Sequence, residues 1–210
     1  MVDLSSTLVK QAKRTGINHI VRLSAIGADA ESRFTVGRLH GQVEKLIEES
    51  GIPYTFLRPN AYMQNFINFY GPTIKNQNAF YLPAGEGKVS FVDVHDVAAV
   101  AVKSLMDSDR HTGKEYDITG SQALSYEEAA EILSYERGRR IRYVNISEND
   151  YRQGMKDVGR YELSIYSTIE LFAISRSGYL SKISPVVEDI TCNKPVSFSQ
   201  FAKDYAYSFK

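Results

Sequence analysis

The stretch Asn18-His-Ile-Val-Arg-Leu-Ser-Ala25 decides the fold of this chain. It is a short apolar run typical of a buried strand, and it ends on the polar residue Ser24. Residues 1–15 carry apolar side chains at helical spacing, and Gly16 follows them as a helix C-cap. A helix, a tight turn and a strand in this order form the second half of a βαβ unit. The stretch therefore predicts an α/β fold.

The alternation of helices and strands continues along the chain. We expect a helix over residues 37–50, strands over 54–58 and 115–119, and a helix over 97–106 that Asp96 caps. Such an order is typical of a doubly wound, mostly parallel sheet with helices on both faces.

Two further elements are expected between these strands. Asn60 is positioned to cap an aromatic helix that carries Tyr62 and Phe66. Residues 80–92 are expected to form a hairpin with its turn at residues 84–87.

The second part of the sequence predicts a smaller, mainly helical lobe over residues 123–210, after a first domain over residues 1–122. Ser125-Tyr-Glu-Glu128 is a capping box, in which the serine hydroxyl and the glutamate carboxylate bind each other's free backbone N–H groups. Ser197-Phe-Ser-Gln200 is expected to open a terminal helix in the same way. The other elements expected in the lobe are a strand at 141–146 and helices at about 148–157 and 161–177.

The composition excludes several classes of protein. Lys and Arg total 25 and Asp and Glu total 25, and a neutral chain without a basic stripe argues against nucleic acid as a partner. The single cysteine, Cys192, cannot form an internal disulfide and fits a reducing cytosol. Since no apolar run approaches about 18 residues, we expect a cytoplasmic protein without a signal peptide or membrane span.

Several segments occur in the order typical of one known family. They are His19-Ile-Val-Arg-Leu-Ser24, His40-Gly-Gln-Val-Glu44, Ser50-Gly-Ile-Pro-Tyr-Thr55, Leu57-Arg-Pro-Asn60, Asp93-Val-His-Asp-Val-Ala98 and Lys194-Pro-Val-Ser-Phe198. With these segments, essentially all 210 residues resemble the NmrA-like family of atypical short-chain dehydrogenase/reductase proteins. The resemblance implies a Rossmann-like domain that binds NADP or NAD, with NADPH favoured, and a small-molecule acceptor.

A glycine-rich phosphate loop is missing from the sequence. The family resemblance implies a Gly-x-x-Gly-x-x-Gly turn that binds the pyrophosphate, but the nearest pattern here is Gly85-Glu-Gly87 in the expected hairpin turn. Since a βαβ unit takes about thirty residues, we expect an N-terminal truncation of roughly 75 residues that removes the leading strands. We therefore expect this chain alone to be inactive. We also expect it to aggregate or to pair with a second copy or a protein partner.

Two residues are candidates for catalysis, Ser24 and His40. The superfamily's Tyr-x-x-x-Lys falls on Val36-Gly-Arg-Leu-His40, and valine cannot donate a proton. By resemblance, Ser24 occupies the superfamily's serine position. His40 occupies the lysine position, where it can bind the nicotinamide ribose or supply a proton to a reduced quinone. The alternative is that Ser24 caps the following turn and that His40 is a polar residue at a helix start.

The resemblance also assigns a cofactor site and an acceptor site. The implied cofactor-binding residues are Ser24, Ala25, His40, Arg58, Pro59 and Asn60. Tyr62 and Phe66 are expected near the acceptor, because aromatic rings stack well on a flat molecule. Packing beneath the lobe is the alternative role for these aromatic residues.

No metal site is expected. Asp93, His95 and Asp96 contain the right ligand types, but Asp96 is better explained as a helix N-cap. Cys192 is not expected to have a functional role.

These observations predict an NAD(P)H-dependent oxidoreductase that reduces a quinone-like or azo-like acceptor by hydride transfer without a Tyr/Lys dyad. Two alternatives remain open at this point. One is a non-catalytic NAD(P) redox sensor that signals to a protein partner. The other is a truncated product that binds no cofactor.

Overall fold

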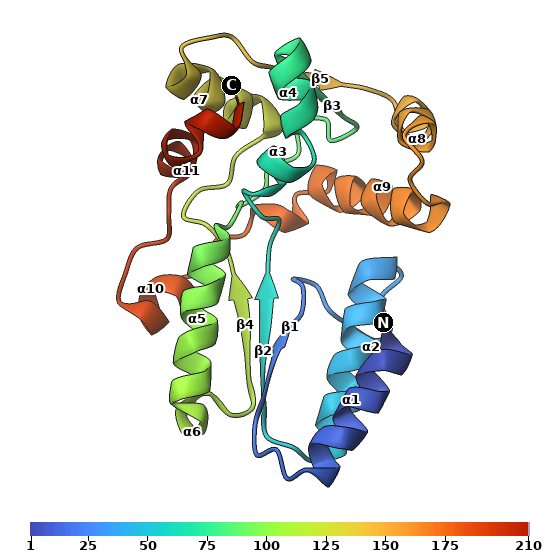
Figure 1. Ribbon diagram of the computed structural model, residues 1–210, viewed down its shortest axis with the longest axis vertical. Helices are drawn as coiled ribbons and strands as arrows, with labels where there is room; N and C mark the ends of the chain where they lie inside the picture. Colours follow the sequence, from blue (N-terminus) through green and yellow to red (C-terminus); the bar gives the residue numbers. More distant parts are fainter. Residues whose placement is uncertain (210) are drawn as a thin grey trace. The chain divides into compact units, whose positions relative to one another are not determined.

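The computed structural model describes residues 1–209, and its contacts group the chain into two units (Figure 1). Unit 1 consists of Met1–Asn60, His95–Ile118 and Ser184–Lys194. Unit 2 consists of Ala61–Val94, Thr119–Ile183 and the residues from Pro195 onward. Each unit is therefore assembled from three separate segments. The single boundary expected between residues 122 and 123 falls inside unit 2.

Unit 1 contains a three-stranded parallel sheet in the order β1-β2-β4. The strands are β1 (Ile20–Leu23), β2 (Tyr54–Pro59) and β4 (Lys114–Ile118). Ile20 pairs with Tyr54, and Thr55 pairs with Lys114. The parallel α/β architecture predicted from the sequence is confirmed.

Helices cover both faces of this sheet. On one face, α1 (Val2–Arg14) and α2 (Thr35–Ser50) lie side by side, as Figure 1 shows. Val9, Val43, Ile47 and Phe56 form the core between these two helices and β2. Side chains alternate along a strand, so Thr55 points to the opposite face. There its hydroxyl donates to the carbonyl of His111 at 2.7 Å.

The helices on that opposite side include α5 (Val94–Met106) and α6 (Ser108–His111). A third helix, α10 (Val186–Thr191), lies next to β4. The sequence expectation that Asp96 caps α5 is wrong, since the helix begins two residues earlier and Asp96 lies in its first turn. The side chain of Gln64 accepts from the Val94 N–H at 3.1 Å.

Two glycines let the loop after β1 approach α2 very closely. A Cβ on Gly41 would lie 2.2 Å from the Ala30 nitrogen, and one on Gly37 would lie 2.7 Å from the Gly27 oxygen. The Asp29 N–H also donates to the Gly37 carbonyl at 3.1 Å. The loop that follows Ser24 is therefore fixed to the first turns of α2.

Gly41→Ala should destabilise unit 1 by about 1–3 kcal/mol, because the added methyl group must displace loop backbone. Gly154 in α8 is the matched control, since a Cβ there meets nothing within 4 Å. Gly154→Ala should stabilise the protein by about 0.5–1 kcal/mol. Urea unfolding followed by circular dichroism measures both. Equal stability of the two variants would contradict the close packing.

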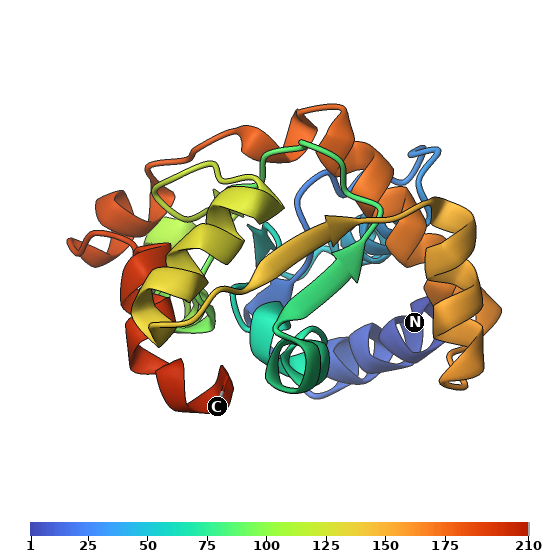
Figure 2. The same ribbon diagram turned by 90° about the horizontal axis from the view of Figure 1, so that it is seen from above.

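Unit 2 is a mainly helical body around a small parallel sheet. Its strands β3 (Ala79–Leu82) and β5 (Arg142–Asn145) pair in parallel and lie side by side in Figure 2. The helices are α3 (Asn65–Asn68), α4 (Gly71–Gln77), α7 (Tyr126–Arg137), α8 (Glu148–Asp157), α9 (Glu162–Arg176) and α11 (Phe198–Asp204). Two short 3₁₀ segments, η1 (Tyr179–Ser181) and η2 (Ala206–Phe209), follow α9 and α11.

An aromatic core holds unit 2 together, and Phe66 lies at its centre. The Phe66 ring is 0% exposed. Its ring centroid lies 5.0 Å from that of Phe198, 5.3 Å from that of Phe91 and 5.6 Å from that of Phe80, each in an edge-to-face geometry. The ring of Tyr126 lies 6.0 Å away. These rings come from distant parts of the sequence, so the core connects the segments of unit 2.

The hairpin expected over residues 80–92 is wrong. A turn does form, with the Gly87 N–H donating to the Ala84 carbonyl at 3.2 Å. However, β3 on one side of it pairs with β5, while Val89 on the other side bridges Leu124. Both halves find partners elsewhere in unit 2 rather than each other.

The helix expected to start at Asn60 is also wrong. The Asn60 N–H donates to the Ile118 carbonyl at 2.9 Å, which extends the sheet of unit 1 by one residue. The first helix after it is α3, whose N-cap is Gln64.

The predicted capping box at Ser125 is confirmed. The Ser125 N–H donates to Glu128 Oε2 at 2.7 Å, and the Glu128 N–H donates to Ser125 Oγ at 3.1 Å. The second box is half formed. Ser197 Oγ accepts from the Gln200 N–H at 3.1 Å, while the Gln200 side chain donates to Asp204. Among residues 1–209, none of the helices is both long enough and apolar enough to cross a lipid bilayer.

Candidate functional site

The carboxyl ends of the unit 1 strands bring several predicted site residues together. The Ser24 N–H donates to the Leu57 carbonyl at 2.7 Å, and the Ile26 N–H donates to the Pro59 carbonyl at 3.1 Å. These bonds place Ser24 and Ala25 beside Pro59, with Asn60 next in the chain. In open parallel α/β sheets, this edge is where ligands bind.

Two buried polar atoms in this region have no hydrogen-bond partner. They are Ser24 Oγ and His40 Nδ1. The Ser24 residue is only 5% exposed, so its hydroxyl cannot rely on bulk water. Leaving such a group without a hydrogen bond lowers the stability of the fold by about 1–3 kcal/mol. Unsatisfied buried groups of this kind are often found at functional sites. Both atoms belong to the two residues predicted from the sequence to act in catalysis.

Burial, together with the charge of Arg22, favours the neutral form of His40. Burial lowers the pKa of His40, the nearby positive charge of Arg22 lowers it further, and Glu44 offsets part of this effect. Near pH 7 the ring is therefore neutral, with one nitrogen able to donate and the other able to accept.

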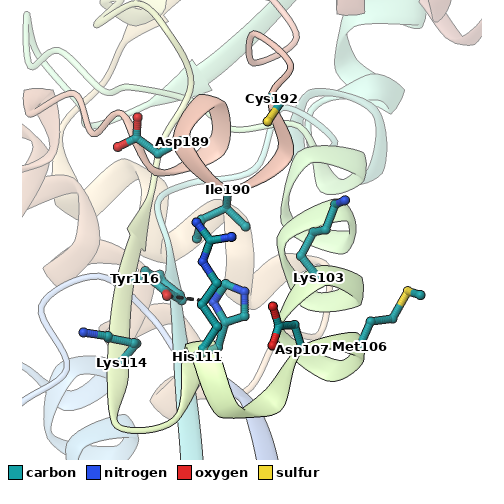
Figure 3. Close-up of a pocket in the computed structure, with 10 residues that line it drawn as sticks. Lys103, Met106, Asp107, His111, Lys114, Tyr116, Asp189, Ile190 and Cys192 are labelled. Carbon is teal, nitrogen blue, oxygen red and sulfur yellow. Dashed lines mark hydrogen bonds between the residues drawn. The ribbon is translucent and has the colours of Figure 1, made fainter.

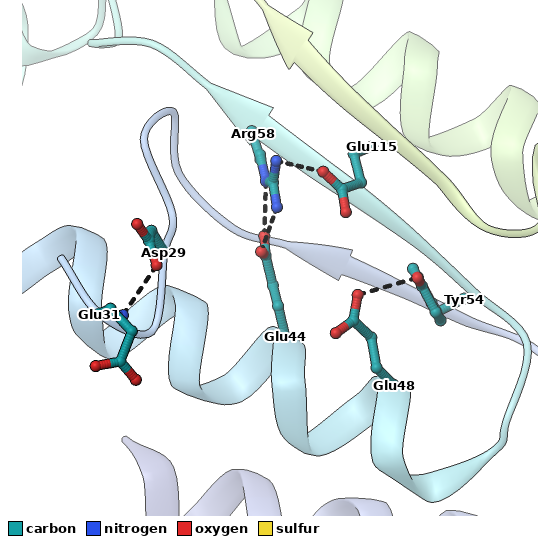
Figure 4. A network of polar contacts seen from close by, with 7 residues as sticks. All are labelled: Asp29, Glu31, Glu44, Glu48, Tyr54, Arg58 and Glu115. Atoms are coloured by element: carbon teal, nitrogen blue, oxygen red, sulfur yellow. Dashed lines mark hydrogen bonds and ion pairs between the residues drawn. The ribbon is translucent and has the colours of Figure 1, made fainter.

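Arg58 has a structural role in the same region. Its Nε and Nη2 donate to the two oxygens of Glu44 at 3.0 and 2.6 Å, and its Nη1 contacts Glu115 at 2.5 Å (Figure 4). The Arg58 guanidinium thus ties α2 to two strands. Glu44 follows His40 by one helical turn, so this ion pair fixes the part of α2 that carries His40. The Arg58 side chain is committed to these ion pairs, and its backbone lies in β2, the central strand of the sheet, opposite Asp117 of β4.

The sequence did not identify Arg22 or Glu44 as part of this region. Arg22 lies on β1 and donates to the Leu23 carbonyl and to the Met1 sulfur. Glu44 is 4% exposed, which is unusual for a carboxylate. The only sequence signal was the spacing of four residues between His40 and Glu44, which places both on one helix face.

Two further histidines, the partly buried His19 and the buried His111, lie on the other face of the sheet. The Thr55 hydroxyl uses its hydrogen on the His111 carbonyl, so its 3.0 Å contact with His19 requires the His19 Nε2–H to donate. His111 Nδ1 lies 2.8 Å from the Tyr116 hydroxyl. Burial is the main reason why the pKa values of His19 and His111 are lowered.

Because of these histidines, stability should fall between about pH 7.5 and pH 5.5. The unfolded chain takes up protons near the ordinary imidazole pKa of about 6.5, while His19, His40 and His111 resist protonation when folded. The unfolded state thus binds more protons, and stability decreases as the pH falls through this range. Melting temperatures measured by circular dichroism test this. His19→Gln should flatten the pH dependence, and a constant melting temperature would contradict it.

The two predicted acceptor residues lie in unit 2. Tyr62 is half-buried, and burial raises the pKa of its hydroxyl. Its backbone bridges Val92. Phe66 packs within the aromatic core and exposes no surface, so the contact with an acceptor expected of it would require the ring to leave that core.

Asp93, which directly precedes α5, takes part in local structure. Asp93 Oδ2 accepts from the Gln64 amide at 2.8 Å. Within residues 1–209, no three His, Cys, Asp or Glu side chains group closely enough to hold a metal ion.

Comparison with known proteins places this geometry in a family context. A model of the NmrA-like family matches residues 2–202. NAD(P)H azoreductase from Xenophilus azovorans is 37% identical over 208 residues, a match that covers 99% of this chain and 72% of the azoreductase.

Solved structures are similar over the same extent. The NADPH-dependent quinone oxidoreductase of Escherichia coli, complexed with NADPH, has a TM-score of 0.85 at 25% identity, covering 95% of this chain and 70% of that one. Triphenylmethane reductase from Citrobacter sp., complexed with NADP(H), shares the fold with a TM-score of 0.83 at 24% identity, covering 98% of this chain and 71% of that one. The match of the family model across nearly the whole sequence, together with the parallel α/β unit, shows that the chain belongs to the NmrA-like family.

Proposed function

We propose that this protein acts in NAD(P)H-dependent reduction of a quinone-like or azo-like small molecule, with NADPH favoured over NAD. The observation that carries the proposal is the pair of unpartnered buried atoms, Ser24 Oγ and His40 Nδ1, near the carboxyl edge of a parallel sheet. Relatives named as an azoreductase and a quinone oxidoreductase support the reaction class.

The residues present fit the nicotinamide part of such a cofactor. A bound nicotinamide would supply the hydride. Ser24 offers an unpartnered hydroxyl, and Ala25, Pro59 and Asn60 lie beside it at the strand ends where such a ring would bind. The sequence has no Gly-x-x-Gly-x-x-Gly turn, so we assign no pyrophosphate contact to this chain.

His40 is proposed to work without a Tyr/Lys dyad. In its neutral form it can donate a hydrogen bond to the ribose or to the oxygen of the reduced acceptor. A quinone accepts a hydride readily, and the hydroquinone anion then takes its proton from water, so the reaction needs no Tyr/Lys dyad.

Reduced nicotinamide mononucleotide tests this assignment directly, because it carries the nicotinamide and its ribose without the rest of the dinucleotide. Saturation-transfer NMR on the 210-residue chain should show contact with the nicotinamide protons. Ser24→Ala and His40→Ala should weaken the signal, and Gly154→Ala, a surface change in α8, should not. A signal that is absent, or equal in all variants, would refute the site.

The same protein samples can distinguish a reductase from a non-catalytic redox sensor. Loss of absorbance at 340 nm on adding a simple benzoquinone or an azo dye supports the reductase. Binding without turnover across several acceptors supports a redox sensor instead. Full NADPH is expected to bind more weakly than micromolar, since the chain lacks the phosphate turn.

A further inference from the structure

A pocket in unit 1 lies on the sheet face opposite α2 (Figure 3). Its volume is about 660 Å³. Side chains from α5, α6, β4 and α10 line it, and Cys192 lies just after α10. It is separate from the candidate site, because Lys114 begins β4 at the end of the sheet opposite Pro59 and Asn60.

Three cationic side chains from three different elements line the pocket. They are Lys103, Arg110 and Lys114. Two carboxylates, Asp107 and Asp189, also line it, so the cations outnumber the anions. None of the three cations forms an ion pair or side-chain hydrogen bond within residues 1–209. The pocket therefore carries a small excess of positive charge, since three cations face two carboxylates.

The rest of the lining is apolar or aromatic. Met106 and Ile190 contribute aliphatic surface, and Tyr116 contributes a ring. That ring is held in place by His111, whose Nδ1 lies 2.8 Å from the Tyr116 hydroxyl and whose own ring packs edge-on at 5.7 Å. A fixed ring next to cations is suited to a ligand with a flat body and an anionic group.

We propose that this pocket binds a small organic dianion with a flat apolar body, of the aryl phosphate class. The Arg110 guanidinium would bind the phosphate through charge-assisted hydrogen bonds. Lys103 and Lys114, which point apart on opposite sides of the pocket in Figure 3, would add positive potential around it. Tyr116, Met106 and Ile190 would cover the aryl ring. This inference does not depend on the proposed reductase function.

The single cysteine of the chain provides a specific reporter for the pocket. Cys192 is exposed and lines the pocket, so a neutral alkylating reagent such as iodoacetamide modifies this thiol alone. Phenyl phosphate at ten times its Kd leaves about one tenth of the sites free, so alkylation should slow about tenfold if the ligand shields the sulfur. Isothermal titration calorimetry gives a second readout of binding that does not depend on shielding.

Matched variants distinguish this pocket from general surface charge. Arg110→Gln with Lys114→Gln should abolish protection and binding heat. Arg160→Gln with Lys203→Gln removes the same charges from exposed positions in unit 2 and should leave both unchanged. Phenol should give no effect, and inorganic phosphate should bind more weakly than phenyl phosphate.

Three results would overturn the proposal. The first is an absence of both protection and heat at millimolar phenyl phosphate. The second is equal binding in the pocket variant and the control variant. The third is equal binding of inorganic phosphate and phenyl phosphate, which would show that the apolar lining takes no part. If the proposal holds, phenyl phosphate should bind more weakly as salt is added, because the salt screens the exposed charges of the pocket.

Discussion

Replacing Phe66 by alanine is expected to destabilise unit 2 by about 3–5 kcal/mol. The ring is 0% exposed and lies against aromatic side chains from other parts of the sequence. Removing it loses the transfer free energy of a phenyl ring and leaves a cavity that the surrounding rings cannot all fill. The edge-to-face contacts with Phe80, Phe91 and Phe198 are lost as well.

Phe69 is the matched control for this change, because it lies three residues later and is 59% exposed. Phe69→Ala should change stability by less than about 0.5 kcal/mol. Urea unfolding monitored by the near-ultraviolet circular dichroism of the tyrosines measures both variants. If the two alanine variants proved equally stable, Phe66 would not be the centre of this core.

Arg58→Met is expected to destabilise unit 1 by about 3–5 kcal/mol. The substitution keeps much of the apolar stem but leaves the carboxylate of Glu44 without its bidentate partner, and that side chain is only 5% exposed. The cost of an unpaired buried charge exceeds the net gain from the pair itself. Since His40 lies one turn away, the NMR signals of its ring should shift in this variant.

Two controls separate the buried pair from its exposed neighbour. Glu115 is 42% exposed, so Glu115→Gln should cost less than about 1 kcal/mol. Arg58→Met combined with Glu44→Leu should recover most of the stability, because neither charge is then left alone in the interior. A double variant no more stable than Arg58→Met would show that the loss comes from packing rather than from the uncompensated carboxylate.

The parts of the fold that were predictable depend on local patterns. Helices α1 and α2, strand β2 and the Ser125 capping box follow from apolar spacing and cap residues close together in the sequence. The hairpin and the Asn60 cap failed for one shared reason. In both cases the backbone groups bond to a distant partner, β5 for β3 and Ile118 for Asn60, and no local pattern encodes that choice.

The candidate site was predictable to a similar degree. The family resemblance, together with their position at the ends of strands, singled out Ser24, Pro59 and Asn60 as candidates. The pairing of Arg58 with Glu44 was not foreseen, because the two residues are 14 positions apart and both are residue types that normally lie in water. The unpartnered state of Ser24 Oγ depends on everything packed around it, which a sequence pattern does not describe.

The interleaving of the two units has a consequence for synthesis on the ribosome. The sheet of unit 1 can pair once residue 118 has emerged, because β1, β2 and β4 are then all available. Unit 2 needs Phe198 from α11 to complete its aromatic core, so its packing must wait until almost the whole chain has left the exit tunnel. At about 5–20 residues per second, the earlier segments of unit 2 remain without their final partner for several seconds. The nascent chain therefore exposes aromatic surface longest in the segment around Phe66. We expect a chaperone that binds apolar segments to bind there.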